Sequence, residues 1–170
     1  DSFKIFSATK LRPEIDYWIA NEVDRKTRKE RVLEAVLKLP RPLILYTTKV
    51  EDANEFVLFL RKEGFRNIEL VTGDSSNNQR DIVIEKWKEG ELDFVVATSA
   101  FGLGIDYKYT RTIIHACIPE TLNRFYQEVG RGGRDGKSSI SLLLPAFGDK
   151  DLAYSMNRKK VIGNEKGFSR

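Results

Sequence analysis

Two arginines set among glycines are the residues of this sequence best suited to chemistry. Arg131 and Arg134 stand three residues apart in the segment QEVGRGGRDG, residues 127–136, so on a helical turn they would lie on nearly the same side. Glycines leave the backbone around them bare, and a guanidinium there can bind a phosphate through two parallel hydrogen bonds. The alternative is a solvated basic loop with a turn at Asp135–Gly136. We favour phosphate binding, because no role in a hydrophobic core explains two such arginines.

A second glycine-containing loop follows a predicted strand, in the segment ATSAFGLGIDY at residues 97–107. Thr98 and Ser99 offer hydroxyl groups to a phosphate, and Gly104 lets bare backbone N–H groups approach one. The carboxylate of Asp106 is suited to a ribose hydroxyl. The alternative is an ordinary glycine-rich turn whose aspartate caps a local backbone group. Taken by itself, this segment fits the alternative somewhat better.

Hydroxyl groups also follow the apolar run at residues 42–48. Thr47 and Thr48 stand at its end in the segment YTTK, where they could contact a backbone phosphate. Their alternative role is N-capping, in which a threonine accepts a hydrogen bond from the first turn of the next predicted helix. The two roles can coexist, so both threonines stay candidates for phosphate contact.

Alternating strands and helices are predicted to position these loops. Apolar runs typical of buried strands occupy residues 42–48, 67–71, 93–98, 111–118 and 139–144, and helix-like segments occupy residues 50–64, 76–90 and 121–129. Strands that are apolar throughout and separated by helices favour a doubly wound α/β fold, with a mostly parallel sheet and helices on both faces. Ligands of such folds bind beyond the carboxyl ends of the strands.

The two ends of the chain differ from its centre. Within residues 1–40, positions 13–20 favour a strand and positions 23–37 a charged helix. We assign this stretch to a segment that connects an upstream domain to the sheet. Residues 41–147 are predicted to form the domain itself. Residues 148–170, with a helix near 150–160, are predicted to be a C-terminal extension.

Composition limits the location and the partners of the chain. The 170 residues carry a net charge of +4 and the pI is about 9.1, which permits contact with a phosphate backbone without demonstrating it. A single cysteine, Cys117, excludes an internal disulfide and a multi-cysteine zinc site. We therefore expect no metal ligands, no membrane partner, and an intracellular location, cytoplasmic or nucleoid-associated. Cys117 and His115 lie in an apolar run and are predicted to be core residues.

Two of these segments together carry a family resemblance. The segment at residues 97–106 (ATSAFGLGID), followed one strand later by residues 119–136 (PETLNRFYQEVGRGGRDG), resembles motifs V and VI of superfamily 2 helicases in their RecQ form. Residues 44–56 (ILYTTKVEDANEF) are similar to motif IV, and residues 11–19 (LRPEIDYWI) to the start of the second RecQ motor domain. The order and spacing of motifs V and VI make the resemblance specific, and it covers roughly residues 11–146.

The sequence also departs from the family pattern. Gly133 replaces the alanine usual in RecQ motif VI, an exchange of small residues that should be tolerated. Residues 71–73 (VTG) lack the histidine that often precedes this glycine, and no cysteine cluster of a RecQ zinc module follows. The sequence contains neither a G-x-x-x-x-G-K-[ST] phosphate loop nor a DExH-type acidic motif. The resemblance implies that these belong to a first motor domain outside this sequence, which holds the ATP phosphates and Mg²⁺.

The resemblance further implies a RecA-like second motor domain that closes over ATP. Arg131 and Arg134 would stabilise charge on the transferring phosphoryl group. Asp106 and Gly104 would contact the ribose, and Gln127 would couple motif VI to the nucleotide. We therefore expect this sequence to be part of a longer ATP-dependent helicase and to be inactive alone.

Nucleic acid is the partner that the resemblance implies. The candidates for contact with its phosphates are Thr47, Thr48, Arg80, Thr98 and Ser99. Contacts of this kind position a strand without reading its sequence. Single-stranded or duplex DNA is favoured over RNA, because the GRDG ending of motif VI and the pair Phe125–Tyr126 resemble RecQ. The alternatives are a DEAD-box or DEAH-type RNA helicase domain, a duplex translocase domain, and a non-catalytic binding module.

Overall fold

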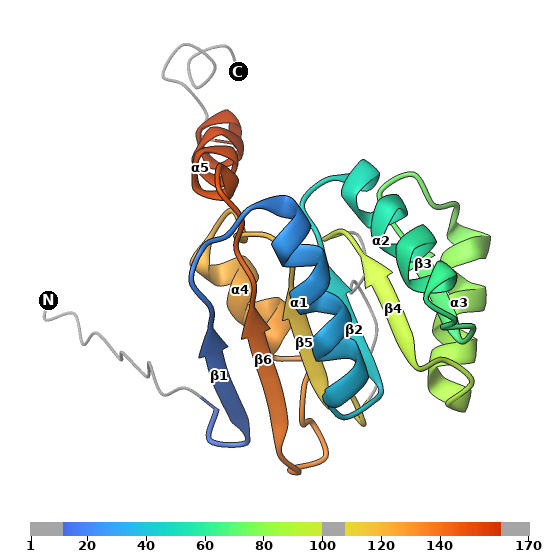
Figure 1. Ribbon diagram of the computed structural model, residues 1–170. Helices are drawn as coiled ribbons and strands as arrows, with labels where there is room; N and C mark the ends of the chain where they lie inside the picture. The colour runs from blue at the N-terminus through green and yellow to red at the C-terminus, as the bar shows by residue number, and fades with distance from the viewer. Residues whose placement is uncertain (1–11, 100–107, 161–170) are drawn as a thin grey trace, which may run out of the picture.

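A computed structural model describes residues 12–99 and 108–160 of the chain (Figure 1). Within these ranges, six strands form one parallel sheet in the order β1-β6-β5-β2-β4-β3. The strands are β1 (Ile15–Ile19), β2 (Leu43–Tyr46), β3 (Ile68–Val71), β4 (Phe94–Ala97), β5 (Thr112–His115) and β6 (Ser139–Leu143). The helices are α1 (Arg25–Lys38), α2 (Val50–Lys62), α3 (Asn77–Glu89), α4 (Leu122–Val129) and α5 (Asp149–Lys160). The predicted doubly wound α/β fold is confirmed.

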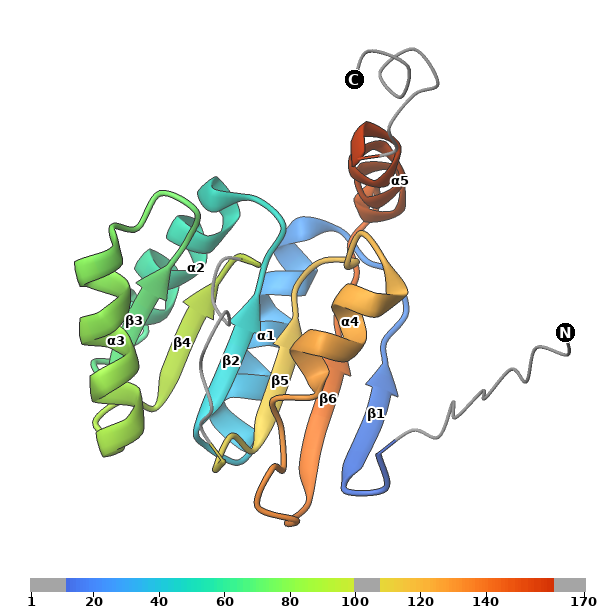
Figure 2. The same ribbon diagram turned by 180° about the vertical axis from the view of Figure 1, so that it is seen from behind.

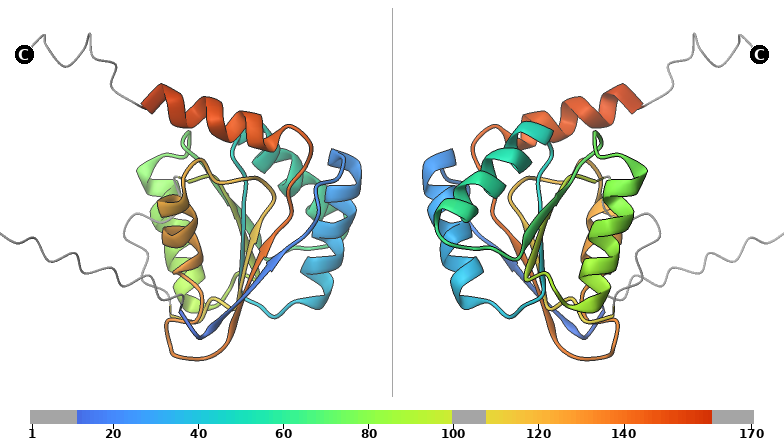
Figure 3. Two further views of the ribbon diagram at one scale, coloured as in Figure 1. Left: turned by 90° about the vertical axis from the view of Figure 1, so that its left-hand side faces the viewer. Right: turned by 90° about the vertical axis from the view of Figure 1, so that its right-hand side faces the viewer.

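The sheet is the middle of three layers. Helices α1 and α2 cover one face, and α3 and α4 cover the other, as Figure 2 and the edge-on views of Figure 3 show. Successive residues of a strand point to opposite faces, so β2 serves two cores. Leu43 and Leu45 pack with α1 and α2, while Ile44 and Tyr46 lie in the core that includes residues of α3. All four side chains are fully buried, with none more than 1% exposed.

Strand β1 and helix α1 are integral parts of this sheet and its covering layers. β1 pairs along its whole length with β6, with Ile15 opposite Ser139 and Ile19 opposite Leu143. Val32 and Val36 of α1 are fully buried. Residues 15–38, which we assigned to a connecting segment, are therefore built into the same layers as the rest. β1 is an edge strand of the sheet, and its Trp18 is 63% and its Ile19 74% exposed.

Capping residues mark both ends of helix α3. Ser76 caps its start by accepting a hydrogen bond from Gln79 N at 3.2 Å, and the Gln79 side chain accepts one from Ser76 N at 3.0 Å. Gly90 ends the helix with a φ of +76°, a left-handed conformation that glycine adopts without strain. Between these caps Trp87 is fully buried. The short turn after Gly90 then delivers the chain to β4.

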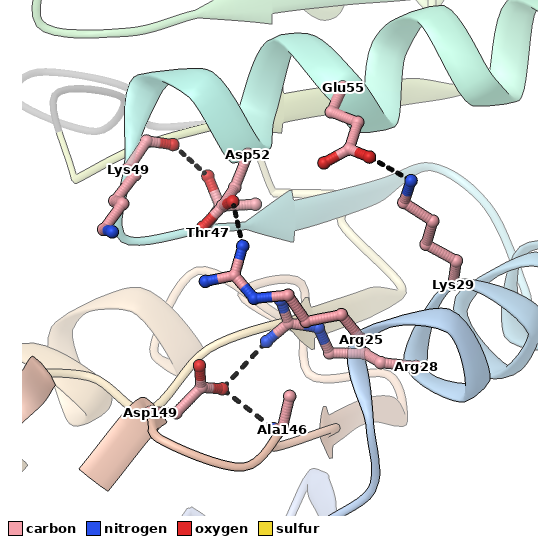
Figure 4. Close-up of polar contacts among 9 residues, drawn as sticks. All are labelled: Arg25, Arg28, Lys29, Thr47, Lys49, Asp52, Glu55, Ala146 and Asp149. Carbon is pink, nitrogen blue, oxygen red and sulfur yellow. Dashed lines mark hydrogen bonds and ion pairs between the residues drawn. The ribbon is translucent and has the colours of Figure 1, made fainter. Parts of the chain in front are cut away.

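Helix α5 stands beyond the carboxyl ends of the strands, at the top of Figure 1. Asp149 at its start accepts a hydrogen bond from Arg28 of α1 at 2.8 Å and one from Ala146 N at 2.9 Å (Figure 4). Arg28 and Asp149 are 3% and 7% exposed, and removing one partner of such a buried pair costs about 3–5 kcal/mol. This buried ion pair therefore holds the start of α5 against α1. None of the described helices has the length and apolar character to cross a membrane.

Candidate functional site

The loop between α4 and β6, residues 130–138, carries both predicted arginines, and we call it the arginine loop. It is a series of turns in which Gly132 N donates to Val129 O at 3.0 Å and Gly136 N to Gly133 O at 3.0 Å. The predicted helical turn is therefore replaced by tighter turns after α4 ends at Val129. Arg134 is exposed and donates from Nε to Gly130 O at 3.1 Å. Arg131 is only partly exposed.

Two glycines let the arginine loop lie directly against the start of β6. A Cβ atom on Gly132 would come within 2.8 Å of the Ser139 Oγ atom, and one on Gly133 within 2.6 Å of Lys137 O. Gly133 also has a φ of +60°, which side chains rarely adopt. An alanine would therefore be strained at this position, whereas the glycine fits it, in keeping with the expectation that this exchange is tolerated.

An ion pair anchors the far end of the arginine loop to the segment before β5. Arg111 Nη1 donates to Asp135 Oδ1 at 2.9 Å, and a second contact joins Nη2 to Oδ2. These hydrogen bonds hold the pKa of Asp135 well below its usual range. Close by, Gly133 N donates to Thr110 O at 3.0 Å. The loop is thus fixed at several points, which limits where its arginines can lie.

Arg131 faces the sheet rather than open solvent. Burial raises the pKa of the Tyr46 hydroxyl, and the positive charge of Arg131 and its hydrogen bond to that hydroxyl act in the opposite direction. Tyr46 is the last residue of β2 and stacks on His115 of β5, with ring centroids 5.3 Å apart. Arg131 is therefore positioned by the centre of the sheet.

A buried polar network seats α4 on the sheet. Glu128 Oε2 lies 2.9 Å from His115 Nε2, and Glu128 Oε1 accepts a hydrogen bond from Arg124 Nε at 3.1 Å. Arg124 also pairs with Glu120. The Phe125 ring lies 5.3 Å from the ring of His115. His115 is fully buried, which confirms its predicted place in the core, while the sequence had not identified its carboxylate partner.

The hydroxyl candidates lie along the carboxyl ends of the central strands. Thr47 follows β2 and Thr98 follows β4, and each backbone is tied to the next strand, by Thr47 N to Ala97 O at 2.9 Å and Thr98 N to Val71 O at 3.1 Å. Both threonines are buried, whereas Thr48 is partly exposed and Ser99 is exposed. The structure thus brings these four residues to one edge, with Ser99 the most accessible of them.

The capping alternative for the two threonines does not hold. Helix α2 has Lys49 as its N-cap residue, and no side chain accepts a hydrogen bond from its first turn. Thr47 instead donates from Oγ1 to Lys49 O at 3.0 Å (Figure 4). A cavity at this edge is lined by residues that include Thr47, Thr48, Ser99 and Arg124. The cavity connects the strand ends with the network under α4.

The remaining candidates are less closely grouped. Arg80 of α3 donates from Nη2 to Thr72 O at 3.2 Å and to Gly73 O at 3.0 Å, so its guanidinium holds the turn after β3. Gln127 is exposed on α4. Gly104 and Asp106 lie outside the described residues. On the opposite face, Arg25 and Lys29 of α1 form ion pairs with carboxylates of α2 (Figure 4).

Comparison with known proteins places these features in a family context. The chain matches the family described as Helicase conserved C-terminal domain over residues 28–136. It is 33% identical over 154 residues to the probable ATP-dependent DNA helicase RecS of Bacillus subtilis, covering 91% of this chain and 31% of that protein. It is 30% identical over 168 residues to ATP-dependent DNA helicase Q1 of Pongo abelii, covering 95% and 25%. The chain thus spans less than a third of these curated relatives.

Solved structures show the same fold. The Escherichia coli DEAD-box protein SrmB, bound to regulator of ribonuclease activity A, superposes with a TM-score of 0.70 at 22% identity, over 89% of this chain and 88% of that chain. The likeness extends the fold comparison beyond the family-matched residues 28–136.

Proposed function

We propose that this chain, which belongs to the helicase conserved C-terminal domain family, is the second motor domain of an ATP-dependent DNA helicase of the RecQ type. The observation that carries the proposal is the arginine loop. Its backbone is fixed by hydrogen bonds to the segment before β5 and by glycine contacts with β6. A loop held in this way presents guanidinium groups at fixed places, which a flexible basic loop does not.

The proposed chemistry is stabilisation of a phosphoryl-transfer transition state. A first motor domain would hold ATP, Mg²⁺ and the attacking water, and Arg134 and Arg131 would face the γ-phosphate once the domains close. Arginines in this role contribute about 10³–10⁵ in rate in other nucleoside triphosphatases. Their effect is large because donors that are already positioned need no reorganisation during the reaction. Gly104 and Asp106 would contact the ribose, and Gln127 would couple α4 to the nucleotide.

The proposed partner is the sugar-phosphate backbone of DNA. Thr47, Thr48, Thr98 and Ser99 lie at one edge of the sheet, where hydroxyl and backbone N–H groups can bind phosphate oxygens. Arg80 would add positive charge near this edge while holding its own turn. DNA is proposed because the relatives named RecS and Q1 are described as DNA helicases. Cycles of domain closure would move the strand past these contacts.

The test replaces the arginines in the complete protein. Arg134→Ala is expected to reduce kcat for ATP hydrolysis by about 10²-fold or more, because a transition-state contact is lost. KM for ATP should change far less, since the other domain holds most of the ground state. Arg131→Ala should act in the same direction. Steady-state ATPase assays at saturating nucleic acid measure both constants.

A matched control separates catalysis from general basicity. Arg66 is an exposed arginine in the turn between α2 and β3, so Arg66→Ala removes the same charge far from the arginine loop. It should leave kcat unchanged. If Arg134→Ala and Arg131→Ala keep near-normal kcat and only bind nucleic acid less tightly, the arginines form a basic surface and the proposed catalytic role is wrong.

A further inference from the structure

Arg12, just before β1, binds the backbone of the arginine loop from the other end of the chain. Its Nη1 atom donates to Gly130 O and to Gly132 O, both at 3.1 Å, and its Nη2 atom donates to Gly133 O at 2.9 Å. Glu14 lies 3.4 Å from its Nε atom. Arg12 stands outside the family-matched residues 28–136, and neither the sequence motifs nor the comparisons assign it a role.

The geometry suits an arginine and few other residues. Helix α4 ends at Val129, so the carbonyl groups of Gly130, Gly132 and Gly133 lie outside its hydrogen-bond ladder, and Gly133 O accepts one backbone bond, from Gly136 N. These three carbonyls converge on one guanidinium, whose donors lie in a fixed planar fork. A lysine ammonium is a single point and could not span the same three acceptors with equally good geometry.

Arg12 and Arg134 share an acceptor. Gly130 O accepts from Arg12 Nη1 at 3.1 Å and from Arg134 Nε at 3.1 Å, which uses both lone pairs of one carbonyl oxygen. The position of Gly130 therefore links the two guanidinium groups directly. The shared acceptor therefore brings two positively charged groups close together.

We propose that Arg12 is a positioning residue for Arg134 and Arg131. The inference rests on the proposed function of those arginines. Arg12 holds the carbonyl groups of the arginine loop in one arrangement and so sets where the two guanidinium groups stand when the motor domains close. It does not touch the nucleotide. Substitution of Arg12 does not remove Arg131 or Arg134 from the sequence, but it lets the backbone of the arginine loop shift.

The first measurement is steady-state ATP hydrolysis by the complete helicase. Arg12→Ala is expected to lower kcat by about 10-fold to 100-fold, because a misplacement of about 1 Å can cost a factor of about 10². KM for ATP should stay close to the unmodified value. Arg12→Lys should give an intermediate kcat, since an ammonium can retain part of the carbonyl contacts. A general loss of folding would instead lower activity without this graded order.

The second measurement is hydrogen exchange of backbone amides in the same proteins. Gly132 N and Gly133 N donate to Val129 O and Thr110 O, and these amides should exchange faster in Arg12→Ala while those of β2 and β5 stay protected. The matched control is Arg61→Ala. Arg61 likewise joins a carbonyl, Ile68 O at 3.0 Å, and a carboxylate, but it lies at α2, away from the loop, and should change neither kcat nor exchange there.

The outcomes distinguish this inference from the proposed function. If Arg134→Ala loses kcat while Arg12→Ala keeps both normal kcat and normal exchange in the loop, the positioning role is wrong and the proposed function stands. If Arg134→Ala and Arg131→Ala both keep near-normal kcat, the proposed function fails. Faster exchange in the loop of Arg12→Ala without a change in kcat would also overturn the positioning role, because a displaced loop would then not matter to catalysis.

Discussion

Burial decides what chemistry Cys117 can perform. Its sulfur lies 3.6 Å from Tyr46 O in the core beyond β5, and burial raises the pKa of the thiol to about 12. Because the thiolate is the reactive form, a raised pKa leaves only about one molecule in 10⁴ reactive at pH 8. We therefore expect thiol reagents to label the native protein very slowly and the urea-unfolded protein fully.

The matched control for labelling is an exposed thiol in the same protein. Ser138 is exposed in the arginine loop, so Ser138→Cys should add one rapidly labelled thiol per chain at pH 8. Labelling of native Cys117 should stay slow at every pH at which the protein remains folded. Complete labelling of the unmodified native protein within minutes at pH 8 would show that Cys117 is accessible and that its burial is misassigned.

The sequence identified the arginines but not the residues that hold them. Glycines beside Arg131 and Arg134 form a local signal, and the structure adds close contacts with β6 as the reason for Gly132 and Gly133. Arg12 gives no such signal, since 118 to 121 positions separate it from its acceptors. The i, i+4 spacing of Arg124 and Glu128 is enough to predict their ion pair on a helix. The pairing of Glu128 with His115 cannot be predicted in this way, because it depends on how α4 packs on the sheet.

At the scale of elements, the parallel sheet gathers the hydroxyl residues on one edge. Thr47 and Thr98 follow neighbouring strands, and their backbone N–H groups donate to Ala97 O and Val71 O. The edge is predicted to bind single-stranded DNA weakly, with little sequence preference. Each phosphate that a lysine or arginine near this edge neutralises should contribute a slope of about −0.7 to the logarithm of affinity against the logarithm of salt concentration. Fluorescence anisotropy with labelled oligonucleotides at several salt concentrations measures that slope.

Two glutamate substitutions locate the contact. Ser99→Glu adds a negative charge at the carboxyl edge, and Ser138→Glu adds the same charge in the loop before β6, at the amino ends of the strands. Both serines are exposed. Ser99→Glu should weaken binding clearly more than Ser138→Glu. Equal effects, or an affinity that does not depend on salt, would count against phosphate contacts at the carboxyl edge.

The elements themselves were largely predictable, and their partners were not. Apolar runs and helical spacing marked each central strand and helix to within a few residues, because burial on both faces leaves a continuous apolar signature in a parallel strand. Residues 15–38, predicted to hold a strand and a helix within a connecting segment, form β1 and α1, but the pairing of β1 with β6 could not be predicted from the local sequence. Strand order also depends on long-range pairing, which no local pattern encodes.

At the scale of the whole molecule, the proposed activity is divided between two domains. The described residues supply the arginine loop and the edge of the sheet proposed to bind nucleic acid, while the sequence has no phosphate loop and no acidic motif for Mg²⁺. Neither part should hydrolyse ATP without the other. The relatives are consistent with such a division, because this chain covers only 31% of RecS and 25% of Q1.

Reconstitution from separate polypeptides tests this division most directly. The first motor domain of the same protein is held at a fixed concentration with ATP, Mg²⁺ and saturating DNA, and this chain is added in increasing amounts. We expect negligible hydrolysis by either polypeptide alone and a saturable increase when both are present. The same titration with Arg134→Ala should give an increase smaller by about 10²-fold. Robust DNA-stimulated hydrolysis by this chain alone, or an equal increase with Arg134→Ala, would contradict the account.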